Sequence, residues 1–110
     1  MINYSNMKES IRNFFGKGRK TNIKQLVQNG AQIIDVRTIG EFNKGHIPGS
    51  VNIPLQDLSR NLSQIKINKT VITCCASGMR SASAKNVLKA NGFAEVYNGG
   101  GWQSLQNKLS

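Results

Sequence analysis

The stretch VITCCASGMRSASA, residues 71–84, constrains the fold more than any other part of this 110-residue chain. An apolar, β-prone run ends at two cysteines, and a small glycine-containing loop then leads into a segment of helical character. A strand, loop and helix in this order are typical of α/β proteins. The helix N-terminus offers unpaired N–H groups and the positive end of the helix dipole to the thiol of Cys75. We therefore expect Cys75 to ionise more readily than a free thiol and to be a candidate nucleophile.

The same alternation of strands and helices runs through the rest of the chain. Short β-rich runs predict strands at residues 31–37, 50–53, 70–74 and 94–97, and apolar spacing predicts helices at residues 23–28, 41–44, 55–62, 80–91 and 102–109. This order predicts one α/β domain, with a central, mostly parallel sheet of about five strands and helices on both faces. Ligands of such sheets bind beyond the carboxyl ends of the strands, which is where Cys75 is expected.

The first 20 residues are predicted to form a basic N-terminal extension to a domain at residues 21–110. Met7, Ile11, Phe14 and Phe15 fall on one side of a helix, so a short amphipathic helix is expected at residues 4–15. Such a helix commonly packs on the core of its own domain. Docking to a membrane surface or to a partner is the alternative.

The net charge of +10, from 15 Lys and Arg against 5 Asp and Glu, is compatible with an ordinary basic surface. It would also attract small anions, an acidic protein or nucleic acid, but the adjacent Phe14 and Phe15 are not interleaved with basic residues, so we predict no nucleic-acid partner. The sequence contains neither a signal-peptide pattern nor an apolar run as long as a membrane span, which predicts a cytoplasmic protein with no membrane partner. Two adjacent cysteines rarely pair with each other, which suits a reducing compartment.

Three motifs together resemble those of rhodanese domains. Residues 35–54, DVRTIGEFNKGHIPGSVNIP, are similar to the family signature DVR-x3-EF-x2-GHI-x-GS-x-NIP. Residues 75–81, CASGMRS, are similar to its C-x-x-G-x-R-S active-site loop, and residues 98–102, NGGGW, to its late glycine element before the last helix. The motifs follow the family's order and span about residues 23–109. The chain therefore resembles a single-domain rhodanese.

The resemblance implies a sulfurtransferase that works through a persulfide on Cys75. A small anionic donor such as thiosulfate would supply the sulfane sulfur, and cyanide, a low-molecular-weight thiol or a thioredoxin-like protein would accept it. No metal or organic cofactor is implied. The expected substrate-binding residues are those of the loop: Ala76, Ser77, Gly78, Met79 and Arg80.

Five further residues have expected supporting or structural roles. Asp35 and Arg37 match family positions close to the loop, and we expect a charged pair that orients it or simply holds the strand end. Glu41 is an alternative partner for Arg37. His46, in Gly-His-Ile-Pro-Gly, is expected to be a turn residue bonded to the backbone and not a general base. Trp102 is expected to pack in the core.

Two features of the loop leave alternatives open. Cys74 is either inert or able to resolve a persulfide on its neighbour. Arg80 is the only charged residue of the loop, and it could attract an anionic substrate, brace the loop, or leave a donor other than thiosulfate preferred. The spacing Cys-x4-Arg is one residue shorter than the Cys-x5-Arg of protein tyrosine phosphatases, which disfavours a phosphatase or arsenate reductase. A non-enzymatic sulfur carrier or docking module is the main alternative to an enzyme.

Overall fold

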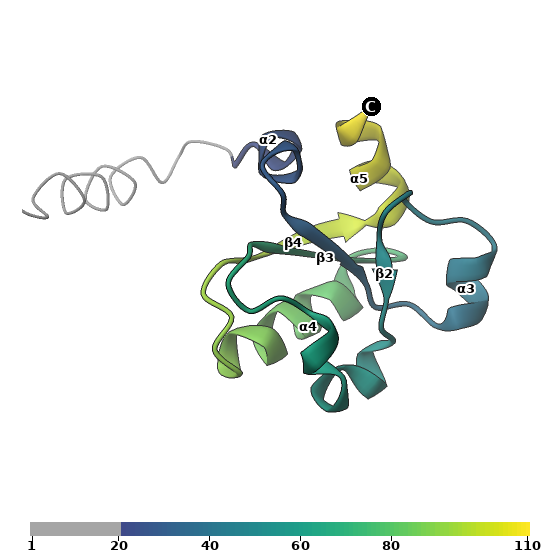
Figure 1. The fold of residues 1–110 in the computed structure, drawn as a ribbon. Helices are drawn as coiled ribbons and strands as arrows, with labels where there is room; N and C mark the ends of the chain where they lie inside the picture. The colour runs from purple at the N-terminus through teal and green to yellow at the C-terminus, as the bar shows by residue number, and fades with distance from the viewer. Residues whose placement is uncertain (1–20) are drawn as a thin grey trace, which may run out of the picture.

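The computed structural model describes residues 21–110, so the predicted basic extension and short helix of residues 1–20 lie outside the described residues. Strands and helices alternate along the chain (Figure 1). In chain order they are α2 (Ile23–Gln28), β1 (Gln32–Asp35), α3 (Ile39–Asn43), β2 (Val51–Asn52), the 3-10 helices η1 (Leu55–Arg60) and η2 (Leu62–Gln64), β3 (Val71–Cys75), α4 (Met79–Ala90), β4 (Val96–Gly101) and α5 (Trp102–Leu109).

The strands form one parallel sheet in the order β2-β1-β3-β4. The predicted α/β class and parallel sheet are confirmed. The predicted number of about five strands is slightly too high, because the described residues contain four. The connection from β2 to β3 forms two 3-10 helices and adds no strand to the sheet.

Most predicted bounds differ from the observed ones by a few residues, and two elements differ in a way that has a clear physical reason. The single helix expected at residues 55–62 is a pair of 3-10 helices, because Asn61 leaves the helical conformation (φ −126°, ψ 27°) and turns its side-chain amide back onto the carbonyl of Asp57. Strand β4 continues through three glycines to Gly101, although glycine has a low strand propensity. A side chain at Gly99 would lie 2.8 Å from the carbonyl oxygen of Thr73, so close packing of β4 on β3 requires glycine there.

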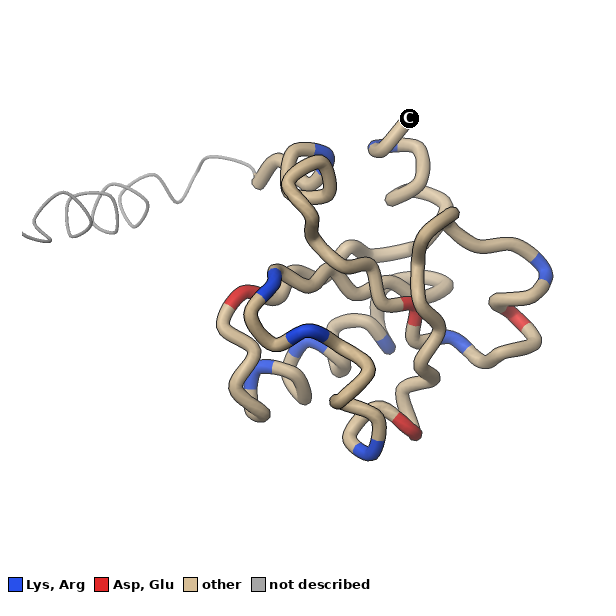
Figure 2. The backbone as a smooth tube through the Cα atoms, viewed as in Figure 1, with Lys and Arg blue, Asp and Glu red and all other residues tan. Residues whose placement is uncertain are grey.

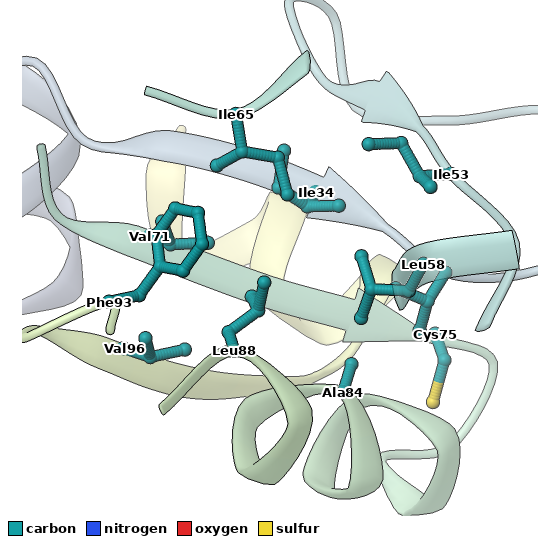
Figure 3. Close-up of a cluster of buried hydrophobic side chains, with 11 residues drawn as sticks. Ile34, Ile53, Leu58, Ile65, Val71, Cys75, Ala84, Leu88, Phe93 and Val96 are labelled. Carbon is teal, nitrogen blue, oxygen red and sulfur yellow. The ribbon is translucent and has the colours of Figure 1, made fainter. Parts of the chain in front are cut away.

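Helices cover both faces of the sheet and enclose two clusters of buried side chains. Helix α4 and the 3-10 helices cover one face, where the buried side chains include Ile34, Val71 and Leu88 (Figure 3). Helices α2 and α5 cover the other, where Ile33, Ile72 and Leu105 are buried. Burial of such apolar side chains is the main stabilising contribution to a domain of this size.

The alternation of side chains in β3 sends the two cysteines to opposite faces. Cys74 lies in the cluster beneath α2 and α5, and Cys75 lies in the cluster beneath α4. The carboxyl end of β1, at Asp35, pairs with β3 at Cys74, so Asp35 and both cysteines share one edge of the sheet. That edge is the one at which the sequence placed a ligand site. No helix of the described residues is both long and apolar enough to cross a membrane.

Candidate active site

The sulfur of Cys75 lies at the junction of β3 and α4, surrounded by donors of the following turn. Its Sγ accepts a hydrogen bond from the backbone N–H of Gly78 at 3.0 Å and another from Ser81 at 3.3 Å. The Ser81 hydroxyl oxygen lies 3.5 Å from the same sulfur. The Cys75 residue is only 1% exposed, and Figure 3 shows its sulfur beside the first turns of α4. The loop therefore forms a concave set of donors that suits an anionic sulfur.

Gly78 makes this turn possible. It is the residue before α4 and has a left-handed backbone conformation, φ 107° and ψ −13°, which residues other than glycine rarely adopt. The left-handed turn brings the N–H of Gly78 back toward the sulfur three residues earlier. The glycine of the C-x-x-G-x-R-S motif is thus a geometric requirement of the loop.

The environment of the two thiols separates their acidities. Burial would raise the pKa of Cys75, but hydrogen bonds that the thiolate accepts from the Ser81 hydroxyl and from the N–H groups of Ser81, Gly78 and Ser77 outweigh it, and the pKa is lowered. Burial raises the pKa of Cys74 to about 12, because its sulfur lies in an apolar layer and next to the negative charge of Asp35. Cys75 is therefore the thiol that ionises first. Cys74, on the opposite face of the sheet, is not placed to resolve a persulfide on Cys75.

Asp35 and Arg37 form a buried ion pair at the same edge of the sheet. Arg37 donates from Nε to Oδ1 of Asp35 at 2.9 Å and from Nη2 to Oδ2 at 2.7 Å, and its backbone N–H also donates to Oδ1 at 3.0 Å. The guanidinium continues to the carbonyl oxygens of Gly45 at 2.8 Å and Glu41 at 3.3 Å. The pair thereby fixes the segment around α3 to the end of β1. The expected charged pair is present, and Arg37 contacts the backbone of Glu41, the residue whose carboxylate binds Arg80 of the loop.

The carboxylate of Glu41 pairs with Arg80. The alternative prediction, that Glu41 is the charged partner of Arg37, is therefore wrong. Oε1 and Oε2 of Glu41 accept from Nη1 and Nη2 of Arg80 at 2.7 and 3.0 Å. Glu41 also completes a capping box with Thr38, the residue before α3. Hydrogen bonding to Arg80, with a further contribution from Thr38, lowers the pKa of Glu41 to about 2. The single cation of the loop is therefore neutralised by a neighbouring carboxylate, and the pair braces the loop against α3.

His46 and Trp102 occupy structural positions. His46 is exposed, contacts the carbonyl oxygen of Phe42 through Nδ1 at 2.8 Å, and stacks on the Phe42 ring with centroids 3.7 Å apart. This is the backbone-bonded turn role that the sequence predicted. Trp102 packs against the cluster beneath α2 and α5, and the Arg37 guanidinium lies 4.7 Å from the centroid of its ring.

Three of the other loop residues lie on the surface. Ala76, Ser77 and Met79 are exposed, and Met79 is 80% exposed at the first position of α4. Lys and Arg positions are distributed over several elements of the described domain (Figure 2). Within residues 21–110, no cluster of His, Cys, Asp and Glu is suited to hold a metal ion.

Comparisons with known proteins show the family of the chain. The sequence model of the family described as the rhodanese-like domain matches residues 20–108. The chain belongs to the rhodanese family. Thiosulfate sulfurtransferase GlpE of Shewanella oneidensis is 33% identical over 79 residues, which cover 68% of this chain and 78% of GlpE. A solved structure described as a rhodanese with anions from Escherichia coli superposes with a TM-score of 0.64 at 31% identity, covering 68% of this chain and 91% of that one.

Two relatives from Bacillus subtilis are more similar in sequence. The uncharacterised protein YqhL is 41% identical over 80 residues, and the putative sulfur carrier protein YrkF is 41% identical over 66 residues. These matches cover 72% and 60% of this rhodanese chain. The chain spans 64% of the length of YqhL and 36% of that of YrkF.

Three residues of the site were not identified from the sequence as site residues. Ser81 follows Arg80 in the loop motif, so its position there was the available signal. Asn98 belongs to the late glycine motif, and its Oδ1 accepts from the Ser81 hydroxyl at 2.6 Å. Glu41 is 39 residues from Arg80, and no local pattern pairs them.

Proposed function

We propose that the chain is a sulfurtransferase in which Cys75 carries the transferred sulfur. The proposal rests on one observation above the others: the Cys75 sulfur accepts hydrogen bonds from the N–H groups of Gly78 and Ser81 in a chain of the rhodanese family. The Cys75 thiolate attacks the sulfane sulfur of thiosulfate, the S–S bond of the donor breaks, and sulfite leaves with its electron pair. Cys75 then holds a persulfide, whose charge the loop N–H groups stabilise.

The second step returns the enzyme to its starting state. A nucleophile, either cyanide or the thiolate of a low-molecular-weight thiol or thioredoxin-like protein, attacks the outer sulfur of the persulfide. The S–S bond of the persulfide breaks, and Cys75 leaves as a thiolate. No general base is required, because the attacking nucleophile and the leaving Cys75 sulfur are both anions.

The charge of the loop favours a donor other than thiosulfate. Arg80 is the single charged residue of the loop, and its guanidinium is bound by the Glu41 carboxylate at 2.7 and 3.0 Å. The exposed Met79 adds an apolar side chain beside it. A persulfide carries at most one negative charge, whereas thiosulfate carries two. We therefore propose that a persulfide donor reacts more efficiently than thiosulfate.

Mass spectrometry after incubation with each sulfur donor tests the function. The wild-type chain should gain one sulfur on Cys75, Cys75→Ser should gain none, and Cys74→Ser, the matched control, should behave as wild type. Cyanide should then release thiocyanate catalytically. If no donor sulfurates Cys75 and no thiocyanate forms, the proposal is wrong, and hydrolysis of an aryl phosphate would favour phosphatase chemistry instead.

A sulfur carrier is the second candidate, and the similarity to the putative sulfur carrier protein YrkF favours it. A carrier would take up one sulfur on Cys75 without rapid turnover on small acceptors. Stoichiometric sulfuration with no catalytic thiocyanate or thiol turnover would therefore support this alternative.

A further inference from the structure

The hydroxyl group of Ser81 lies among three acceptors and has one proton to donate. Its Oγ is 2.6 Å from Oδ1 of Asn98, 3.0 Å from the carbonyl oxygen of Gly78 and 3.5 Å from Sγ of Cys75. The residue is fully buried, so water does not supply further partners. A single hydroxyl proton can form only one good hydrogen bond at a time. The direction of this proton therefore decides what Ser81 presents to the sulfur.

The side chain of Asn98 is held so that its oxygen faces Ser81. The N–H of Gly100 donates to Oδ1 at 2.9 Å, and Nδ2 donates to the carbonyl oxygen of Gly78 at 3.2 Å. An amide turned the other way would place its NH2 group against the N–H of Gly100, two donors face to face. The contact between Ser81 and Asn98 is also the shortest of the three, so the Ser81 proton points to Asn98.

When its hydroxyl donates to Asn98, Ser81 presents an oxygen lone pair to Cys75. A lone pair accepts a hydrogen bond from the S–H group, which favours the neutral thiol. A thiolate instead needs a donor, and a hydrogen bond to a charged acceptor is stronger than one to a neutral amide. The hydroxyl can supply that bond by rotating from Asn98 toward the sulfur.

We propose that Asn98 is a positioning residue for sulfur transfer. Its side-chain oxygen accepts the hydrogen bond of the Ser81 hydroxyl while Cys75 is a thiol, and the hydroxyl turns to donate to the sulfur once Cys75 is ionised or sulfurated. The proton of Cys75 goes to solvent in this step, and Ser81 keeps its own proton throughout. Asn98 thus opposes ionisation of the resting thiol and acts only through Ser81. The assignment rests on the proposed function of Cys75, but the resting equilibrium can be measured without any sulfur donor.

The pH dependence of Cys75 alkylation by iodoacetamide, followed on the Cys75 peptide by mass spectrometry, tests the assignment. In Asn98→Ala the freed hydroxyl turns to the thiolate, and the midpoint should fall by about one pH unit. Gly78 keeps a partner in this variant, because its carbonyl oxygen also accepts from the N–H of Ala82 at 3.1 Å. Asn91→Ala, which removes an exposed amide at the far end of α4, is the matched control and should leave the midpoint unchanged.

The same substitution in a Ser81→Ala background separates positioning from a general structural role. Without the hydroxyl, Asn98→Ala should no longer move the midpoint. A loosened loop would instead weaken the N–H donors and raise the midpoint whether or not Ser81 is present. Either that result or an unchanged midpoint in Asn98→Ala would overturn the assignment.

A second variant keeps the test valid if Asn98→Ala does not fold. Asn98→Asp retains an oxygen toward Ser81 and holds the proton more strongly, so the midpoint should rise, and by less when Ser81 is absent. A lower midpoint would contradict the assignment. Failure of sulfuration at Cys75 would refute the proposed function but leave these alkylation results interpretable.

Discussion

The carboxylate of Glu41 and the guanidinium of Arg80 form a bidentate ion pair with oxygen–nitrogen distances of 2.7 and 3.0 Å, although the two residues are 39 positions apart in the sequence. Glu41 belongs to the helix that precedes β2, and Arg80 closes the loop that holds Cys75. The pair therefore ties the loop to α3 and cancels the loop's only positive charge at the same time.

Removing the Glu41 charge should improve the use of thiosulfate. Glu41→Gln keeps the capping box of α3, since glutamine serves that motif as well as glutamate does. The exposed charge of Arg80 should then raise kcat/KM for thiosulfate about fivefold at low ionic strength, because one charge about 8 Å from a dianion contributes about 1 kcal/mol in water.

Steady-state kinetics with thiosulfate and with a small alkyl persulfide that has no other charged group would measure this effect. The gain should shrink as salt is added and should be smaller for the persulfide. Glu95→Gln removes the same charge at the opposite end of the sheet and serves as the control. An equal gain in both variants would show that net charge, and not the pairing with Arg80, controls donor choice.

The two cysteines should differ strongly in their reaction with iodoacetamide. The pKa of Cys75 is lowered by the hydrogen bonds of its loop, so its thiolate should be present, and alkylation should proceed, below the pH that a free thiol requires. The pKa of Cys74 is raised to about 12 by burial, so it should stay unmodified in the folded protein. Peptide mapping by mass spectrometry across a pH series checks both. A midpoint for Cys75 at that of a free thiol would contradict the role assigned to the loop N–H groups.

Breaking the buried pair should cost far more stability than breaking an exposed one. Asp35→Ala leaves the Arg37 guanidinium, whose side chain is 5% exposed, without its carboxylate, and we expect a loss of about 3–5 kcal/mol in the free energy of unfolding. Asp57→Ala breaks an exposed pair with Arg60 and should cost less than about 1 kcal/mol. Urea denaturation of the two variants measures the difference, and similar losses would show that Arg37 has other adequate partners.

Gly99 should tolerate no side chain. A Cβ there would lie 2.8 Å from the carbonyl oxygen of Thr73, 2.9 Å from Ile72 and 3.0 Å from Leu105, and the backbone oxygen cannot move without disturbing β3. Gly99→Ala should therefore destabilise the domain by about 1–3 kcal/mol. Gly40→Ala is the control, because the nearest atom to its Cβ is 4.0 Å away and alanine favours the helix. A denaturation midpoint unchanged in Gly99→Ala would mean that β4 can shift away from β3.

Local patterns determined the α/β class, the parallel sheet and Cys75 at a strand–helix junction, because apolar periodicity and turn residues act over short distances along the chain. The same patterns misjudged β4, since pairing with β3 as far as Gly101 continues the strand through three glycines against their propensity. They also merged two 3-10 helices into one helix, since the break at Asn61 is made by a side chain bonding to the backbone.

The sequence by itself determined the family motifs, the order of the elements and the thiol that we propose carries the transferred sulfur. Only the tertiary structure decided which charged and polar groups meet around that thiol. The pairing of Glu41 with Arg80 and the contact of Ser81 with Asn98 join segments 39 and 17 residues apart. Such contacts depend on how the strands assemble into a sheet, because the assembly brings their carboxyl ends to one edge, and no local spacing encodes it.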